Sequence, residues 1–426
     1  MVNLIDAEIA GMLSMGVYPP IFHRFRKSRI FCLRFFKDSK WRYVLIDDRL
    51  PIYKGARTLV FGSCKNAEEL WVPLIEKAYA KLHGCYQTLV SGFIDDGLAD
   101  MTAMVCEKLQ IHNRRGEFDR DSEKFWKQLE MYKESGSLMG CSVTGGTEHG
   151  VRIDGVDTGI MSGHAYSLND VFEIPDEEME KARKTHRMQR VRNPWGRGEW
   201  KLKWSDDSEE IDKHEDKIMQ YFSTLEEEER PILGANDGTF LINYASFRDI
   251  YNRLFIVNDF PGSWSAIRFH SEWTRESSGG LPIEKTEAAN KRFAKNPQFV
   301  FQADEDCEMF CSLQQSDGRE VQNNKYSKYP FADRVVSTML FLFELPDGMD
   351  SLPSYTTCPA MEKATPKVLH EISMRVELKA GKKYAIIPSP RKPGTLGHFH
   401  LSIYTSACQH EFDVVRADDP SNQCKF

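Results

Sequence analysis

Hydrophobic and polar positions alternate in some stretches of the chain and follow a helical repeat in others. Alternation over residues 28–36 and 40–53 predicts two paired strands joined by a turn. A helical repeat of apolar residues predicts helices over residues 69–84, 122–134 and 1–20. Gly84 ends the first of these, Gly136 lies just beyond the second, and Tyr-Pro-Pro ends the third. The first part of the chain is therefore expected to combine helices and strands.

Short apolar runs predict further strands in the middle of the chain. Strongly charged segments separate them, and we interpret these segments as solvent-exposed loops or helix faces without a binding role. The predicted strands are SLMGCSV (137–143), GHAYSLNDVFEI (163–174), RMQRVRNPW (187–195) and GTFLINYASF (238–247).

Beyond about residue 260 the chain becomes a series of short strand patterns with turn residues between them. This series predicts an antiparallel β-sandwich, which makes the chain α+β as a whole. In the last pattern apolar and polar positions alternate, so one face is expected to be buried and the other wet. The strands are predicted at 298–304, 337–345, 371–378, 382–389 and 397–406, with Phe399, Leu401 and Ile403 buried and His398, His400 and Ser402 exposed.

Composition narrows the class of protein. The chain has 426 residues, enough for two or three domains, and with 41% hydrophobic and 28% charged residues it has the composition of a globular protein. A net charge of -7 argues against nucleic acid as a partner. The ten cysteines include no Cys-x-x-Cys pair, and the first residues lack a signal-peptide pattern. We therefore expect reduced thiols and a cytoplasmic location.

The candidate chemistry lies in two short motifs, GHAYS around His164 and RNPWG around Asn193. An imidazole that pairs with a thiol makes a thiolate available at neutral pH. A side-chain amide oxygen that accepts the other ring N–H fixes the tautomer of that imidazole. Pro194 biases Asn193 toward an extended backbone, which gives its side chain a defined direction. The two motifs thus indicate the base and the orienting residue of a cysteine protease.

Several motifs together resemble those of the calpains, papain-like cytosolic proteases that are switched on by calcium. The motifs are LWVPLIEKAYAKLHGCY, GSLMGCS, GHAYS, RVRNPWGRGEWKLKWSDDS and DGTFLINYASF, followed by NPQF and YAIIPSPRKPGTLGHFHLSIY. The resemblance extends to about residue 410. It implies a papain-like, two-lobed protease core followed by a β-sandwich. The expected divisions are an incomplete first lobe (1–117), a second lobe (118–257), the sandwich (262–412) and a tail (413–426).

The resemblance also assigns roles to individual residues. It implies that His164 activates the thiol and that Asn193 orients His164. Trp195 would cover the hydrogen bond between them and exclude water. Gly163 would let the backbone of a protein or peptide substrate pass closely, which a residue without Cβ permits.

The nucleophile of the family is not found in this sequence. In calpains it lies in a turn similar to QGxxGDCW, and by spacing that turn is expected before Met1. Cys64 is the one cysteine predicted in a loop, and no Gly-Cys-Trp elbow surrounds it. The glycine pair that follows Asp-Phe-Thr in calpains is replaced by Ala103 and Met104, and the methionine is expected to intrude into the cleft. The chain as given is therefore expected to lack peptidase activity.

Calcium is the cofactor that the resemblance implies. The second-lobe site of the family would use Glu199, Asp206 and Asp237, but its last acidic position is Thr239 here. Calcium takes six to eight oxygen ligands and gains affinity from carboxylate charge. The site is therefore expected to be weakened or empty.

Two functions stay open at this point. The first is a calpain-type cysteine endopeptidase whose thiol lies outside this sequence. The second is a catalytically inactive relative that serves as a regulatory or binding scaffold, which the changes at Met104 and Thr239 favour. Membrane contact by the sandwich is unsupported, because it shows no cluster of loop aspartates for calcium and phospholipid. The oligomeric state is left open.

Overall fold

The protein is described here by a computed structural model. It describes residues 17, 28–38, 40–56, 58–64, 69–89, 92, 94–112, 118, 121–145, 148–175, 185–227, 230–260, 262–315, 335–364 and 370–406, and the backbone of 412–415. The helix predicted over residues 1–20 lies outside these residues except for Val17. The chain divides into two compact units, Met1–Cys106 with Phe260–Phe426, and Glu107–Asp259.

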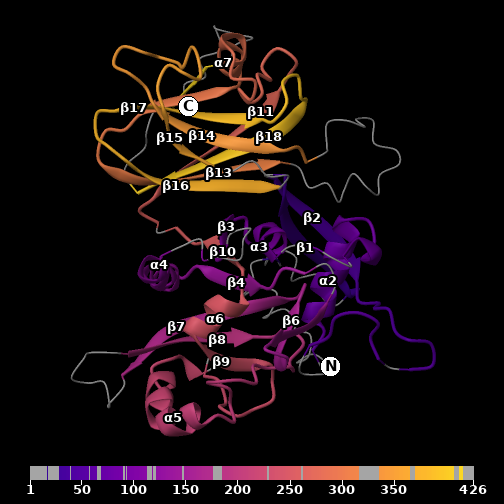
Figure 1. The fold of residues 1–426 in the computed structure, drawn as a ribbon. Coiled ribbons are helices and arrows are strands. Elements are labelled where there is room, and N and C mark those ends of the chain that lie inside the picture. Colours follow the sequence, from indigo (N-terminus) through magenta and orange to yellow (C-terminus); the bar gives the residue numbers. More distant parts are fainter. Residues whose placement is uncertain are drawn as a thin grey trace. The chain divides into compact units, whose positions relative to one another are not determined.

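The unit Glu107–Asp259 is built on a six-stranded sheet in the order β3-β10-β4-β7-β8-β9 (Figure 1). The neighbouring strands from β10 to β9 all pair antiparallel. A separate hairpin, β5 and β6, precedes β7. The strands are β3 (Val105–Gln110), β4 (Leu138–Ser142), β5 (His149–Ile153), β6 (Val156–Ser162), β7 (Ala165–Pro175), β8 (Thr185–Arg192), β9 (Thr239–Asn243) and β10 (Arg253–Asn258).

Three helices accompany this sheet: α4 (Ser122–Glu134), α5 (Glu209–Phe222) and α6 (Tyr244–Ile250). The helix predicted over 122–134 is confirmed, and the carboxylate of Asp121 caps it by accepting two backbone N–H bonds. The strand predicted over 238–247 is correct only in its first half. Its second half is α6, because the Asn243 side chain accepts the Ser246 N–H and starts a helix.

The first hundred residues contribute a hairpin and two helices to the other unit. They are β1 (Ile30–Lys37), β2 (Lys40–Asp47), α2 (Trp71–Leu82) and α3 (Ile94–Thr102), with a short 3₁₀ helix, η2 (Tyr86–Leu89). The predicted hairpin and the helix at 69–84 are both confirmed.

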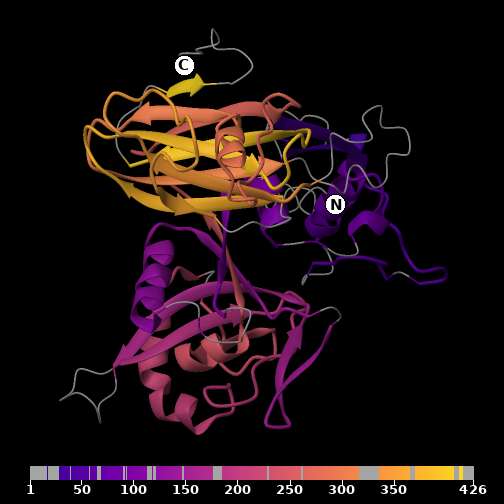
Figure 2. The same ribbon diagram turned by 45° about the horizontal axis from the view of Figure 1, so that its top comes forward.

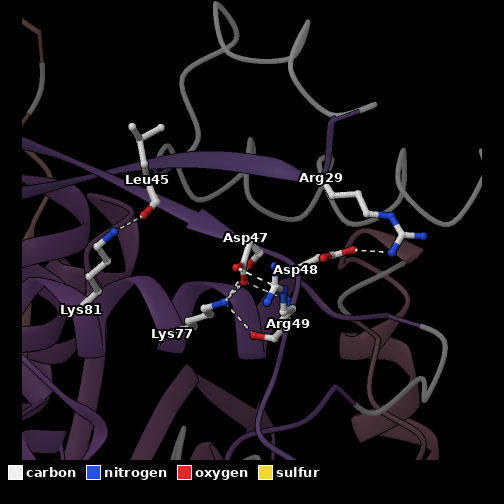
Figure 3. Close-up of polar contacts among 7 residues, drawn as sticks. All are labelled: Arg29, Leu45, Asp47, Asp48, Arg49, Lys77 and Lys81. Atoms are coloured by element: carbon white, nitrogen blue, oxygen red, sulfur yellow. Dashed lines mark hydrogen bonds and ion pairs between the residues drawn. The ribbon is translucent and has the colours of Figure 1, made fainter.

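Lysines of α2 fasten this helix to the end of β2 (Figure 3). The Lys77 ammonium donates to the Asp47 and Arg49 carbonyl oxygens at 2.9 and 2.7 Å, and to the Asp47 carboxylate. Lys81 donates to the Leu45 carbonyl oxygen at 2.7 Å, one turn further along the helix. These bonds satisfy carbonyls of β2 and of Arg49, just beyond its end, and tie both to α2.

Ala103 has a backbone φ of +62°, a left-handed conformation that suits glycine and strains other residues. Calpains are expected to have glycine here. We predict that Ala103→Gly raises the free energy of unfolding by about 1 kcal/mol, because the strain at Cβ is removed. Urea denaturation measures this change. Ala99→Gly, inside α3, is the control and is expected to lower stability by a similar amount. A loss of stability in Ala103→Gly would contradict the prediction.

The second segment of this unit, Phe260–Phe426, contains two antiparallel sheets packed in layers (Figure 2). Their orders are β11-β18-β13-β16 and β15-β14-β17-β12-β19. Side chains of both sheets form one hydrophobic core, which includes Phe269, Leu340 and Leu401. The strands are β11 (Ser265–Trp273), β12 (Gln298–Gln302), β13 (Cys307–Gln315), β14 (Thr338–Glu344), β15 (Ala360–Lys363), β16 (Glu371–Leu378), β17 (Lys383–Pro390), β18 (Gly397–Thr405) and β19 (Phe412–Val415), with the helix α7 (Glu287–Phe293).

The predicted strands of this region are all observed, and β18 has the predicted buried face. Two positions of its wet face differ from the prediction: His400 is half-buried, and Ser402 is buried, with its hydroxyl accepting a 2.8 Å bond from Arg268. Strand β19 pairs with β12 through Val415, so it includes residues that we expected in the tail. Among the described residues, none of the helices has the length and apolar character needed to cross a membrane.

Candidate active site

His164 lies at the turn that joins β6 to β7. The preceding residue, Gly163, has a φ of +65°, and its N–H donates to the Val143 carbonyl oxygen at 2.8 Å. Glycine adopts this backbone conformation without strain. The turn thus fixes the direction in which the His164 side chain leaves the sheet. Passage of a substrate backbone at Gly163 stays a prediction.

The structure brings His164 and Asn193 together. His164 Nε2 and Asn193 Oδ1 are 2.9 Å apart, and both residues are buried. Asn193 Oδ1 also accepts the Trp195 N–H at 3.0 Å, while Asn193 Nδ2 donates to the Gly198 carbonyl oxygen at 3.0 Å. These bonds fix which end of the amide faces the histidine. Since Oδ1 only accepts, His164 Nε2 must carry a hydrogen.

Trp195 lies against the His164 ring. The ring centroids are 4.2 Å apart and the rings are inclined by 41°. Tyr166 approaches His164 edge-on at 5.0 Å. The Trp195 side chain is 49% exposed, so it shields one face of the imidazole while remaining in contact with solvent. The shielding role predicted for Trp195 agrees with this placement, although its effect on activity stays a prediction.

The backbone around Asn193 is held by close contact with Gly238. The Asn193 N–H donates to the Gly238 carbonyl oxygen at 2.7 Å. A Cβ at Gly238 would lie 2.7 Å from the Asn193 carbonyl oxygen and 2.9 Å from the Arg197 nitrogen. Gly238 also has a φ of +86°. A residue with a side chain does not fit here without moving the Asn193 loop.

The second ring nitrogen of His164 has a partner that sequence reasoning missed. His164 Nδ1 lies 3.1 Å from the Glu148 carboxylate. Glu148 precedes β5, 16 positions before His164. No motif surrounds Glu148, and the contact joins two residues 16 positions apart, so the sequence carries no local signal for it.

Burial disfavours the thiolate form of several cysteines in the described part of the chain. Cys141, on β4, is fully buried, and burial raises its thiol pKa well above the ordinary value. Burial also raises the pKa of Cys32, Cys311 and Cys358. A nucleophilic cysteine requires the opposite shift. Cys64 belongs to the other unit and is half-buried.

The three carboxylates predicted for calcium are electrostatic neighbours. Burial raises the pKa of Asp206 to about 6, and the charges of Glu199 and Asp237 add to that shift. However, Glu199 accepts the Gly238 N–H at 2.7 Å, and Asp237 accepts the Thr239 N–H at 2.9 Å. Within the described ranges no group of three or more His, Cys, Asp or Glu side chains is arranged to hold a metal ion.

Comparison with known proteins covers both units. Residues 17–258 match the family model "Calpain family cysteine protease", and residues 269–404 match "Calpain large subunit, domain III". A calpain of Schistosoma mansoni is 28% identical over 92% of this chain, and calpain-5 of Mus musculus is 29% identical over 93%. The aligned parts cover 50% and 61% of those two relatives. The protease-family match alone spans more than half of the 426 residues, and the chain therefore belongs to the calpain family of cysteine proteases.

Proposed function

We propose that this chain carries the base and the orienting residue of a calpain-type cysteine endopeptidase that acts on protein or peptide substrates in the cytoplasm. The supporting observation is the 2.9 Å contact between His164 Nε2 and Asn193 Oδ1. That contact leaves Nδ1 as the nitrogen that would take a proton from a thiol. In the finer architecture that we propose, residues 1–117 belong to the first lobe, 118–257 form the second lobe and 262–412 a regulatory β-sandwich.

As it stands, the 426-residue chain is expected not to cleave casein, because no cysteine of its sequence lies in a Gly-Asp-Cys-Trp turn. Release of acid-soluble peptides measures cleavage. Hydrolysis that a thiol alkylator abolishes would overturn the expectation and direct attention to Cys64.

Urea denaturation in calcium and in a chelator tests whether calcium binds. We propose that Glu199, Asp206 and Asp237 bind it only weakly, so that millimolar calcium raises the free energy of unfolding by less than about 0.5 kcal/mol. A rise of several times that size would indicate an intact site.

The alternative function is a non-catalytic scaffold, and three internal residues favour it. Met104 stands where calpains are expected to have glycine, Thr239 where they have an acid, and Glu148 contacts the ring nitrogen that a thiol would use. Fusing a helix that begins with Gly-Asp-Cys-Trp to the N-terminus separates the two functions. Activity that appears in the fusion and is lost again in His164→Ala supports the endopeptidase. Continued inactivity of the folded fusion supports the scaffold.

A further inference from the structure

The contacts around the His164 ring leave only one of its two nitrogens in a position to act as a base. Trp195 covers a face of the ring and Tyr166 approaches it with its edge. Nε2 is committed to Asn193 at 2.9 Å. Nδ1 is therefore the nitrogen through which His164 would act as a base, and Glu148 Oε1 lies 3.1 Å from it.

The contact between His164 Nδ1 and the Glu148 carboxylate depends on which ring nitrogens of His164 carry a hydrogen. The amide orientation of Asn193 places a hydrogen on Nε2. A neutral imidazole would then present a bare lone pair at Nδ1, which a carboxylate oxygen would repel. The 3.1 Å approach requires a proton between Nδ1 and Oε1. Glu148 and His164 thus hold that proton together as a charge-assisted hydrogen bond.

We propose that Glu148 is a built-in block on His164: its carboxylate engages Nδ1 through the shared proton, so the imidazole accepts no proton from a nucleophile until Glu148 moves away. This inference rests on the proposed role of His164 as a base. The neighbouring His149 does not compete for Nδ1, because its ring contacts the Ser162 hydroxyl at 2.8 Å. The block is reversible, since the Glu148 side chain is 48% exposed and exposed ion pairs are weak.

Acylation of His164 by diethyl pyrocarbonate tests the block, because this reagent attacks an imidazole nitrogen that carries no proton. Trypsin releases residues 153–181, in which His164 is the only histidine, so mass spectrometry follows this one side chain. We expect Glu148→Gln to accelerate its acylation up to about fivefold. The matched control is Glu215→Gln, which removes the same charge from an exposed position of α5 and is expected to leave the rate unchanged.

Proton NMR supplies a second measurement that loss of packing alone would not reproduce. The full chain is expected to show a low-field ring N–H resonance from the bond to Glu148. This resonance should be absent from both Glu148→Gln and His164→Ala and retained in Glu215→Gln. An acylation rate and an N–H spectrum in Glu148→Gln equal to those of the parent chain would overturn the proposal. Neither measurement depends on hydrolysis, so failure of the block is distinguishable from failure of the proposed protease function.

Discussion

Replacing Lys37 with methionine is expected to lower the free energy of unfolding by about 3–5 kcal/mol, because the change leaves a buried carboxylate without its cation. Lys37, at the end of β1, forms a 2.7 Å ion pair with Asp100 of α3. The two side chains are only 2% and 5% exposed. The Tyr79 hydroxyl donates to the same carboxylate oxygen at 2.7 Å. Urea denaturation followed by circular dichroism measures the loss.

Two further variants separate lost charge pairing from lost packing. Lys40→Met removes an exposed lysine from the same hairpin and is expected to change stability by less than about 0.5 kcal/mol. Lys37→Met combined with Asp100→Leu removes both charges and is expected to recover much of the loss. A double variant that is no more stable than Lys37→Met would show that the charge left unpaired is not the cause.

The Asp100 carboxyl also determines how the free energy of unfolding depends on pH in the acidic range. Burial alone would raise the pKa of Asp100, but His83, whose Nε2 lies 3.7 Å from the carboxylate, and the Lys37 charge outweigh it, so the pKa is lowered from its ordinary value. A carboxyl with a lowered folded-state pKa contributes stability that is present above its unfolded pKa. That contribution is lost as the pH falls through the folded-state value. In Lys37→Met, the stability that is lost on acidification through protonation of Asp100 should therefore be smaller.

Local patterns allowed much of the fold to be predicted. Helix α4 has an Asp121 cap, a helical repeat and a glycine after its end, and its predicted bounds are those observed. Local sequence patterns do not predict strand β13. It is buried at almost every position, so it lacks the alternation that reveals a half-buried strand. Strands β14 and β17 are buried to a similar extent but were predicted from their continuous apolar runs, whereas Ser312, Gln314 and Gln315 interrupt the apolar run of β13.

Only those site residues that lie in a recognisable motif could be predicted from the sequence. His164 and Asn193 are 29 positions apart, yet each lies in a recognisable motif. Glu148 and Glu371 lie in no motif. Burial raises the pKa of Glu371 to about 7, and its carboxylate accepts the Cys106 N–H, 265 positions away, at 3.1 Å. Such contacts follow from the packing of distant segments, which no local pattern encodes.

Replacing Gly238 with alanine is expected to lower the free energy of unfolding by about 3 kcal/mol or more, because overpacking adds to left-handed strain. A Cβ here meets three backbone atoms at 2.7–2.9 Å, among them the Asn193 carbonyl oxygen. Backbone atoms cannot rotate aside as a flexible side chain would. Relief of the clash requires the Asn193 loop to move, and the loop holds the amide that orients His164.

Gly234→Ala is the matched control for Gly238→Ala. Gly234 has a φ of +75°, close to the +86° of Gly238, but a Cβ there meets nothing within 4 Å. The control therefore carries the left-handed strain without the clash and is expected to lower stability by about 1 kcal/mol. Urea denaturation of both variants gives the difference, which measures how tightly the Gly238 backbone supports the Asn193 loop. Equal losses in the two variants would show that this loop yields freely, and the rigid hold on Asn193 would then have to come from its side-chain bonds alone.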